Sequence, residues 1–296
     1  MNRHVKIPFF FLIPALLLLA AFVLYPIVNT VYLSFIDQNG NFVKLENYQK
    51  VFGTKLYPLI NVKNVALGKF PMGALIHNIL CMIIHLPLCV FFGLLLAVLL
   101  RDVKGGSIMK SVIFLGMVIP LIVGGVLVRF TLDRDAGVLN GILRAIGLGG
   151  LVADWTVYPN TALIAVILGS VWIWTGFSMI VYSAGLEGIP IDLYEAAKID
   201  GASRWKTFWR ITVPMLKPAT IIVVTMTLLW ELKIFDIVYI VTNAGPGGAS
   251  DVMAFRMYIQ AFELPPNYGT ASAIATMLTI ITLGFAAYMV NRMTKS

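Results

Sequence analysis

Long apolar stretches separated by short polar connections dominate the chain. Five stretches contain no Asp, Glu, Lys or Arg, and each can hold the helix of about 20 residues that crosses hydrocarbon. They cover residues 7–36, 70–100, 111–128, 155–186 and 264–291. A sixth apolar stretch ends at Trp230 and is followed by Glu231, Lys233 and Asp236, so the sixth predicted span carries three charges. The pattern predicts an all-α integral membrane protein with six transmembrane helices.

The chain is predicted to form a single transmembrane domain over residues 1–296, because no internal repeat and no low-complexity linker divides it. The first span is expected to be uncleaved, since its uncharged run of 30 residues has no small-residue cleavage signal early in it. One sizeable loop, residues 187–217, separates two spans. The predicted spans cover about residues 8–35, 74–100, 108–130, 160–184, 218–241 and 269–290.

Composition supports the membrane assignment. Hydrophobic residues make up 59% of the 296 residues and charged residues 12%, with a mean hydropathy of +0.88. Soluble domains carry about 25% charged residues, so a soluble globule is excluded. The net charge of +8 then indicates a basic cytoplasmic side, and no nucleic-acid partner is expected.

The positions of Lys and Arg predict the orientation. With six spans both termini share one side, and the side holding the termini and the 187–217 loop has the denser basic charge. We therefore expect both termini in the cytoplasm. Twelve basic residues then lie on that side: Arg3, Lys6, Arg101, Lys104, Lys110, Lys198, Arg204, Lys206, Arg210, Lys217, Arg292 and Lys295.

The 187–217 loop carries signals for two helices. Asp192, with Glu195 three residues later, resembles a capping box that starts a helix at the next residue. Gly201 is placed to end this helix in a left-handed conformation. Ser203 can cap a second, amphipathic helix along the membrane surface, which Pro214 is expected to end.

Two interpretations of this loop remain open from composition alone. The small residues Ala196, Ala197 and Ala202 would let another backbone approach closely, as in a helix that enters a partner's groove. The aromatic face around Trp205 and Trp209 would by itself explain a helix that anchors the loop in lipid.

The loop motif resembles that of permease subunits in binding-protein-dependent ABC importers. Residues 193–202 read Leu-Tyr-Glu-Ala-Ala-Lys-Ile-Asp-Gly-Ala, which is similar to the sugar-type branch, and residues 235–246 resemble the stretch that marks the maltose-type first subunit. Val213 and Ala244 are mild departures from the family pattern. Further positions that fit are Gly137, Asn140, Trp155, Ile189, Pro190, Phe208, Ile211, Pro214 and Pro218.

The resemblance implies a transport subunit rather than an enzyme. Residues 193–203 would be the coupling helix that docks on a separate ATPase, which would bind ATP and Mg, so no cofactor is expected in this chain. The implied partners are a second permease subunit, two ATP-binding subunits, an extracytoplasmic solute-binding protein, the sugar and the bilayer. The coupling residues implied are Tyr194, Glu195, Ala196, Ala197, Asp200, Gly201 and Ala202.

Two motifs resemble sites of other kinds, a phosphate-binding loop and a metal site. Residues 105–111 have the end spacing of a phosphate loop, but Met109 stands where that motif needs glycine. Residues His77, Cys81, His85 and Cys89 recur at every fourth position, yet at about 1.5 Å rise per residue they spread over roughly 18 Å of helix, so one ion could reach two of them. We expect neither a nucleotide site nor a metal site.

The helix after the loop carries the candidate substrate site. Thr227, Trp230 and Glu231 lie within about one turn and combine a hydroxyl, an aromatic face and a carboxylate, a set that suits a sugar. The resemblance supports this, because the corresponding maltose-type positions are among those lining the sugar path. Trp174 and Phe177 of the preceding span are further candidates. Lys233 and Asp236, three residues apart, could form an ion pair.

The function predicted is that of a permease subunit of an ATP-driven carbohydrate importer in a prokaryotic cell membrane. One alternative is the same machine for a solute such as glycerol phosphate, against which Glu231 speaks. Another is a secondary transporter coupled to protons through Glu231 and Asp236, which should show an internal repeat that this chain lacks.

Overall fold

The computed structural model describes residues 9–53, 58–263 and 265–293. The regular structure in these ranges is helical, with one isolated β-bridge between Ile36 and Phe42, which confirms the predicted all-α class. The start of the first predicted span at residue 8, together with Arg3, Lys6 and Lys295, lies outside the described residues.

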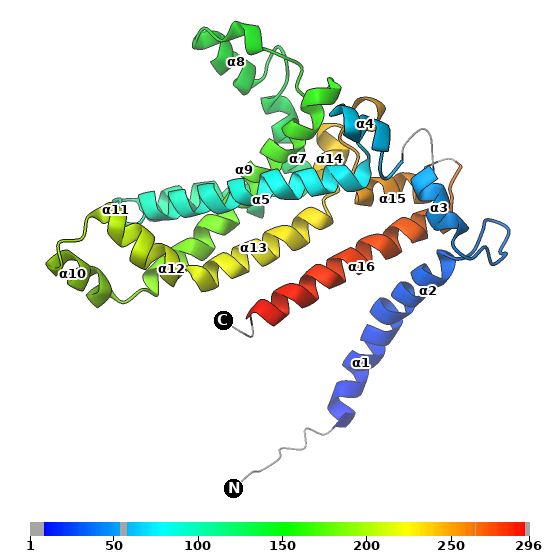
Figure 1. Ribbon diagram of the computed structural model, residues 1–296, viewed down its shortest axis with the longest axis horizontal. Helices are drawn as coiled ribbons and strands as arrows, with labels where there is room; N and C mark the ends of the chain where they lie inside the picture. Colours follow the sequence, from blue (N-terminus) through cyan, green and yellow to red (C-terminus); the bar gives the residue numbers. More distant parts are fainter. Residues whose placement is uncertain (1–8, 54–57, 264, 294–296) are drawn as a thin grey trace.

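A long N-terminal rod stands apart from the other helices (Figure 1). It consists of η1 (Phe9–Leu12), α1 (Ile13–Leu19), the π-helical turn η2 (Ala20–Leu24) and α2 (Tyr25–Leu33). None of the residues of its apolar span is buried within the chain. The α2 end of the rod packs on the bundle, against α16 (Tyr268–Met293). Its apolar surface is therefore left for lipid or for another subunit.

The centre of the bundle is α9 (Pro159–Glu187), which packs against α5 (Ala74–Leu99), α6 (Gly106–Val118) and α13 (Lys217–Leu232). Small residues allow this close packing. A Cβ on Gly176 of α9 would lie 2.9 Å from the Cα of Phe114 on α6, so only glycine fits there. Because α9 is surrounded by other helices, most of its span is buried, as expected for a helix that is apolar on all sides.

Two of the predicted spans are broken helices. The predicted span 108–130 bends by 104° between α6 and α7 (Leu121–Thr131), because Ile119 precedes a proline and takes an extended conformation. The predicted span 218–241 ends as α13 at Leu232 and resumes as α14 (Asp236–Val241). In the described residues, four single helices are long and apolar enough to cross a membrane. Two bent pairs also are: α6 with α7, and the segment Arg204–Met215 with α13, which meet at 63°.

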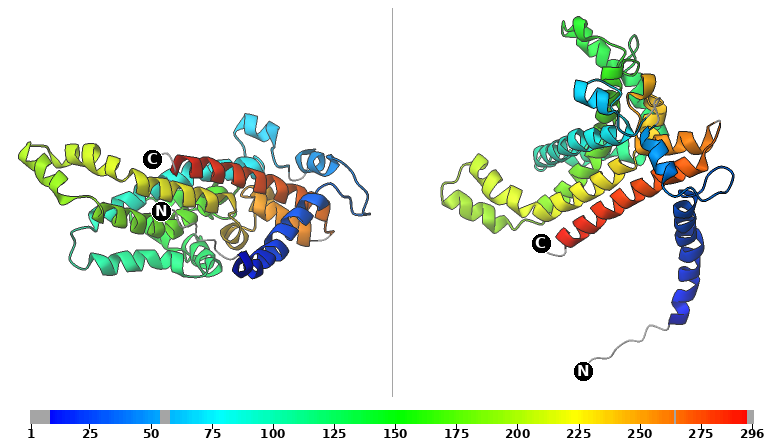
Figure 2. Two further views of the ribbon diagram at one scale, coloured as in Figure 1. Left: turned by 90° about the horizontal axis from the view of Figure 1, so that it is seen from below. Right: turned by 45° about the vertical axis from the view of Figure 1, so that its right-hand side comes forward.

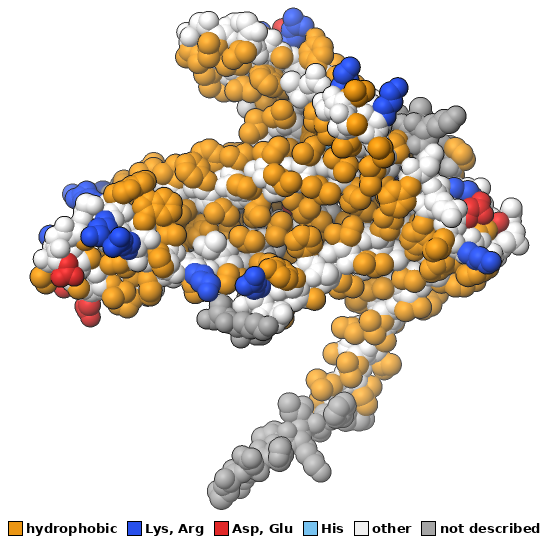
Figure 3. Space-filling view, in the orientation of Figure 1, with side chains coloured by type: hydrophobic (Ala, Val, Ile, Leu, Met, Phe, Trp, Pro, Cys, Tyr) orange, Lys and Arg blue, Asp and Glu red, His pale blue; other side chains and the backbone are white. Residues whose placement is uncertain are grey.

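Most of the remaining helices lie at the two ends of the bundle, whereas α8 projects from its side in Figure 1. Figure 1 places α10 at one end and α3, α4 and α15 at the other, with an apolar belt between them in Figure 3. Figure 2 shows the same separation from two further directions. The bounds are α3 (Glu46–Gly53), α4 (Val62–Leu67), α8 (Val138–Ala145), η3 (Gly149–Leu151), α10 (Ile191–Ile199), α11 (Arg204–Thr207), η4 (Phe208–Thr212), α12 (Val213–Met215), η5 (Pro246–Gly248) and α15 (Met253–Phe262).

Candidate coupling surface and substrate pocket

The loop after α9 folds into the predicted helix, glycine turn and second helix. Gly201 has φ +70°. Its N–H donates to the carbonyl of Lys198 at 3.1 Å and the N–H of Ala202 donates to that of Ala197 at 2.9 Å, the two bonds of a Schellman motif. The side chain of Ser203 accepts the N–H of Lys206 at 3.3 Å, as predicted for a helix N-cap. The turn therefore follows from local chemistry.

Two details of this loop differ from expectation. The first helix begins at Ile191, with Pro190 at the N-cap, so Asp192 lies within the first turn and forms no capping box. There its carboxylate faces the positive end of the helix dipole. The second helix continues past Pro214 to Met215, because Pro214 lies in the first turn of α12, where proline is tolerated.

The predicted coupling residues divide between the surface and the interior. Glu195, Ala196, Asp200 and Gly201 are exposed, and no atom of this chain comes within 4 Å of a Cβ built on Gly201. Tyr194 and Ala202 are half-buried. The sequence predicts that Ala197 is exposed, but only 8% of it is, because it lies on the face of α10 that packs against the rest of the protein.

Tyr194 fastens α10 to the membrane helices. Its hydroxyl lies 3.2 Å from Oγ1 of Thr212, and the guanidinium carbon of Arg101 stands 5.2 Å from the centre of its ring. Arg101 follows the end of α5 and Thr212 belongs to η4. A single side chain therefore links three elements, and Tyr194 holds the loop in position rather than facing outward.

A pocket of about 230 Å³ opens where α13 breaks. Trp174 of α9 stacks on Trp230 of α13, with ring centres 4.1 Å apart and planes 21° apart. Phe177 meets Trp230 edge-on at 4.8 Å. The structure thus brings together the three aromatic candidates from the sequence. The residues that line the pocket are Leu121, Ser170, Ile173, Trp174, Trp230, Lys233, Ile234, Phe235, Asp236 and Ile237.

The other two substrate candidates, Thr227 and Glu231, lie outside this pocket. Both are 1% exposed, and Glu231 Oε2 lies 3.2 Å from Nδ1 of the equally buried His85 on α5. Successive residues of a helix are separated by about 100°, so Trp230 and Glu231 point to different sides of α13 although they are neighbours in the sequence. In this structure the carboxylate therefore lies between α13 and α5 and not in the pocket.

Lys233 and Asp236 both line the pocket, and the structure shows no ion pair between them within its described residues. The chain leaves the helical path at Lys233, which ends α13, and resumes at Asp236, the first residue of α14. The pocket therefore presents a cation, a carboxylate and a stacked pair of indole rings. Charges within a span indicate a cavity or a partner, as expected for these residues, but the sequence offered Lys233 and Asp236 as an ion pair and did not include them among the substrate candidates.

The stripe of His and Cys residues on α5 takes part in packing between helices. His85 pairs with Glu231 and has Cys89 Sγ 3.3 Å from its Nε2. His77 lies at the other end of the stripe, where its Nδ1 is 2.8 Å from the carbonyl oxygen of Asp251 and its Nε2 accepts the N–H of Met72. His77 and His85 therefore connect α5 to other parts of the chain at two separate positions along the helix.

Comparison with known proteins identifies relatives along almost the whole chain. A probable ABC transporter permease protein of Pyrococcus horikoshii is 51% identical over 99% of both chains. The osmoprotective compounds uptake permease protein of Synechocystis is 36% identical, covering 90% of this chain and 92% of the relative. The alpha-glucoside transport system permease protein of Rhizobium meliloti is 34% identical, covering 97% and 82%.

The fold is also found in a solved structure. A bacterial ABC transporter involved in the import of the acidic polysaccharide alginate contains a chain that matches with a TM-score of 0.77 at 20% identity, covering 96% of this chain and 94% of that one. The model of the binding-protein-dependent transport system inner membrane component family matches residues 89–295. The chain therefore belongs to this family, the permease subunits of ABC importers.

Proposed function

We propose that this permease subunit carries a carbohydrate through the membrane, driven by ATP hydrolysis in a separate subunit. The observation that carries the proposal is the pocket in which Trp174 and Trp230 stack beside Lys233 and Asp236. Indole faces suit the apolar faces of a sugar ring, and charged groups suit its hydroxyls. The alpha-glucoside permease of Rhizobium meliloti, named above, supports the same substrate class.

The proposed assembly contains this chain, a second permease subunit, two ATPase subunits and an extracytoplasmic solute-binding protein. The exposed side chains of α10, Glu195 and Ala196, and the turn at Asp200 and Gly201 would enter a groove of the ATPase. Ala197 and Tyr194 hold this surface against the bundle. ATP and Mg would be bound by the ATPase subunits.

The proposed topology has six spans within a single domain over residues 1–296: four single helices, the bent pair of α6 and α7, and α13 followed by α14. Both termini and the 187–217 loop lie in the cytoplasm of a prokaryotic cell. Single cysteines at Lys44 and Lys206, introduced after replacement of Cys81 and Cys89, test this orientation. We expect labelling of position 44 in intact cells and of position 206 only after permeabilisation; the reverse pattern contradicts the topology.

The substrate class is tested with the complete complex reconstituted in lipid vesicles together with its binding protein. Uptake of radiolabelled maltose, trehalose and other α-glucosides is measured with and without ATP. We expect ATP-dependent uptake of at least one of them and competition from related glycosides. If none is transported while a non-carbohydrate solute is, the carbohydrate assignment is wrong.

A second substrate class is favoured by one observation. Lys233, which is exposed, lines the pocket, whereas the carboxylate of Glu231 is directed away from it. An anionic solute such as glycerol phosphate would use that ammonium group. Asp236 on the same pocket opposes an anion, so the neutral carbohydrate stands first. Adding glycerol 3-phosphate to the uptake assay separates the two classes.

A further inference from the structure

A second pocket lies behind the coupling helix, at the opposite end of the bundle from the α13 break. It encloses about 430 Å³, in the range of small-molecule sites. The end of α5, the end of α9, α10 and the α11–η4 segment all contribute to it. The lining residues are Val98, Arg101, Leu186, Tyr194, Lys198, Ala202, Arg204, Thr207, Phe208 and Thr212.

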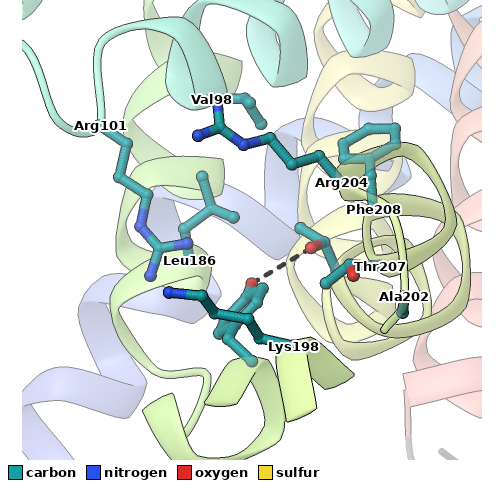
Figure 4. Close-up of a pocket in the computed structure, with 10 residues that line it drawn as sticks. Val98, Arg101, Leu186, Lys198, Ala202, Arg204, Thr207 and Phe208 are labelled. Atoms are coloured by element: carbon teal, nitrogen blue, oxygen red, sulfur yellow. Dashed lines mark hydrogen bonds between the residues drawn. The ribbon is translucent and has the colours of Figure 1, made fainter. Parts of the chain in front are cut away.

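The pocket combines three cations with an apolar wall. Arg101, Lys198 and Arg204 come from three different elements, and Figure 4 shows their side chains gathered on one side of the pocket. No acidic side chain is among the described residues that line it, and none of the three cations forms an ion pair within the described part of the chain. The three side chains are exposed, and three like charges around one cavity create a positive potential that favours an anion between them.

The floor of the pocket is built and fixed in place. Tyr194 and Thr212 are joined there by the hydrogen bond between their hydroxyls, whose oxygens lie 3.2 Å apart. The guanidinium of Arg101 is held over the Tyr194 ring. The hydroxyl of Tyr194 and the guanidinium of Arg101 are therefore oriented before an anion binds, which lowers the entropic cost of binding.

The level of the pocket in the membrane follows from the aromatic residues beside it. Trp205 is 71% exposed and Trp209 is 52% exposed, both on the segment that forms one wall. Tryptophan collects at the membrane–water interface, where lipid phosphates lie. The apolar wall of Val98, Leu186 and Phe208 would meet the first carbons of an acyl chain, whereas a free phosphate ion would leave that wall without a partner.

We propose that this pocket binds a phosphate group of the cytoplasmic leaflet, carried by an anionic lipid. The phosphate would lie between Arg101, Lys198 and Arg204, and so connect the end of α5 to both helices of the coupling loop. Binding would hold α10 at a defined height relative to the membrane helices, and thereby make the engagement with the ATPase depend on lipid composition. This inference rests on the cytoplasmic position of the loop proposed above.

Lipid binding to the purified complex in detergent tests the proposal without any transport measurement. Short-chain phosphatidylglycerol, short-chain phosphatidylcholine and inorganic phosphate are titrated separately, and bound lipid is counted by native mass spectrometry while the midpoint of thermal unfolding is recorded. The pocket variant carries Arg101→Gln, Lys198→Gln and Arg204→Gln. The matched control carries Lys104→Gln, Lys206→Gln and Arg210→Gln, which removes the same charge from the same predicted side of the membrane.

We expect phosphatidylglycerol to bind and to raise the unfolding midpoint of the parent and the control, and phosphatidylcholine to do neither. Three basic residues near a lipid surface predict an affinity about 100-fold weaker for the pocket variant. Equal phosphatidylglycerol binding by pocket and control variants would overturn the site. Saturation by inorganic phosphate at the same concentration would overturn the lipid source. A failure of sugar uptake alone leaves this binding result unaffected, so the two proposals fail separately.

Discussion

Neighbours in the sequence build the proposed coupling loop, whereas residues far apart in the sequence build the proposed substrate pocket. The turn at Gly201 is closed by hydrogen bonds that span no more than five residues. The pocket needs Trp174, Trp230 and Asp236, which come from three helices. The difference teaches that a docking surface can be encoded locally, while the chemistry of a membrane path depends on which face each helix turns inward.

The first prediction, which has the largest expected effect, concerns the turn at Gly201. Gly201→Asp places a side chain at φ +70° in the exposed turn, where a left-handed conformation costs a non-glycine residue about 1–2 kcal/mol and the new charge would face the ATPase. We expect normal membrane insertion, weak retention of the ATPase and transport near background, measured by co-purification and vesicle uptake.

The matched control is Gly105→Asp. Gly105 also has a left-handed conformation, φ +79°, and also has open space around it, but it lies outside the 187–217 loop. The backbone strain is therefore similar and the docking surface is untouched. Equal loss of transport in both variants would show that strain, rather than docking, explains the effect at Gly201.

The second prediction concerns the buried face of α13. Glu231→Ala removes the carboxylate beside Nδ1 of the buried His85, and an unsatisfied buried polar group costs about 1–3 kcal/mol. We expect a lower thermal unfolding midpoint for the purified complex, whereas Glu231→Gln, which keeps the shape and a hydrogen-bonding group, should lose less. Loss of sugar recognition at unchanged stability would return Glu231 to the substrate site.

The third prediction concerns the pocket face of the same helix. Trp230→Ala removes the stacked pair with Trp174, and aromatic contacts are worth about 0.5–1.5 kcal/mol beyond their buried area. We expect the KM for uptake to rise about tenfold or less, with ATP hydrolysis still stimulated by the binding protein. Trp172→Ala, on the exposed side of α9, is the control and should transport as the parent does.

The smallest effect is expected at Lys233, and its direction distinguishes the substrate classes. An exposed charge–charge contact is worth about 0.2–1 kcal/mol, so Lys233→Met should change uptake of a neutral sugar by less than about fivefold. Uptake of an anionic solute should fall further. Comparison of the two solutes in the same vesicles measures this, and complete loss of neutral sugar uptake in an assembled complex would contradict the assignment.

The two broken spans show where the hydrophobic pattern of the sequence no longer predicts the path of the helix. Pro120 carries a visible signal, since the residue before a proline avoids the helical region, yet composition alone does not reveal a 104° bend. The break at Lys233 has no proline or glycine to mark it. At this break Lys233 and Asp236 line a pocket, because burying a charge inside a membrane is costly. The neighbouring helices decide where such a pocket can form.

By itself the sequence determined the all-helical class, the apolar stretches, the glycine turn and the family motif, because these depend on local composition and on short-range hydrogen bonds. Tertiary structure alone decided that Trp230 faces the pocket and Glu231 faces His85. A 100° step per residue sends neighbours to different sides of a helix, and packing of α5, α9 and α13 decides which side is buried.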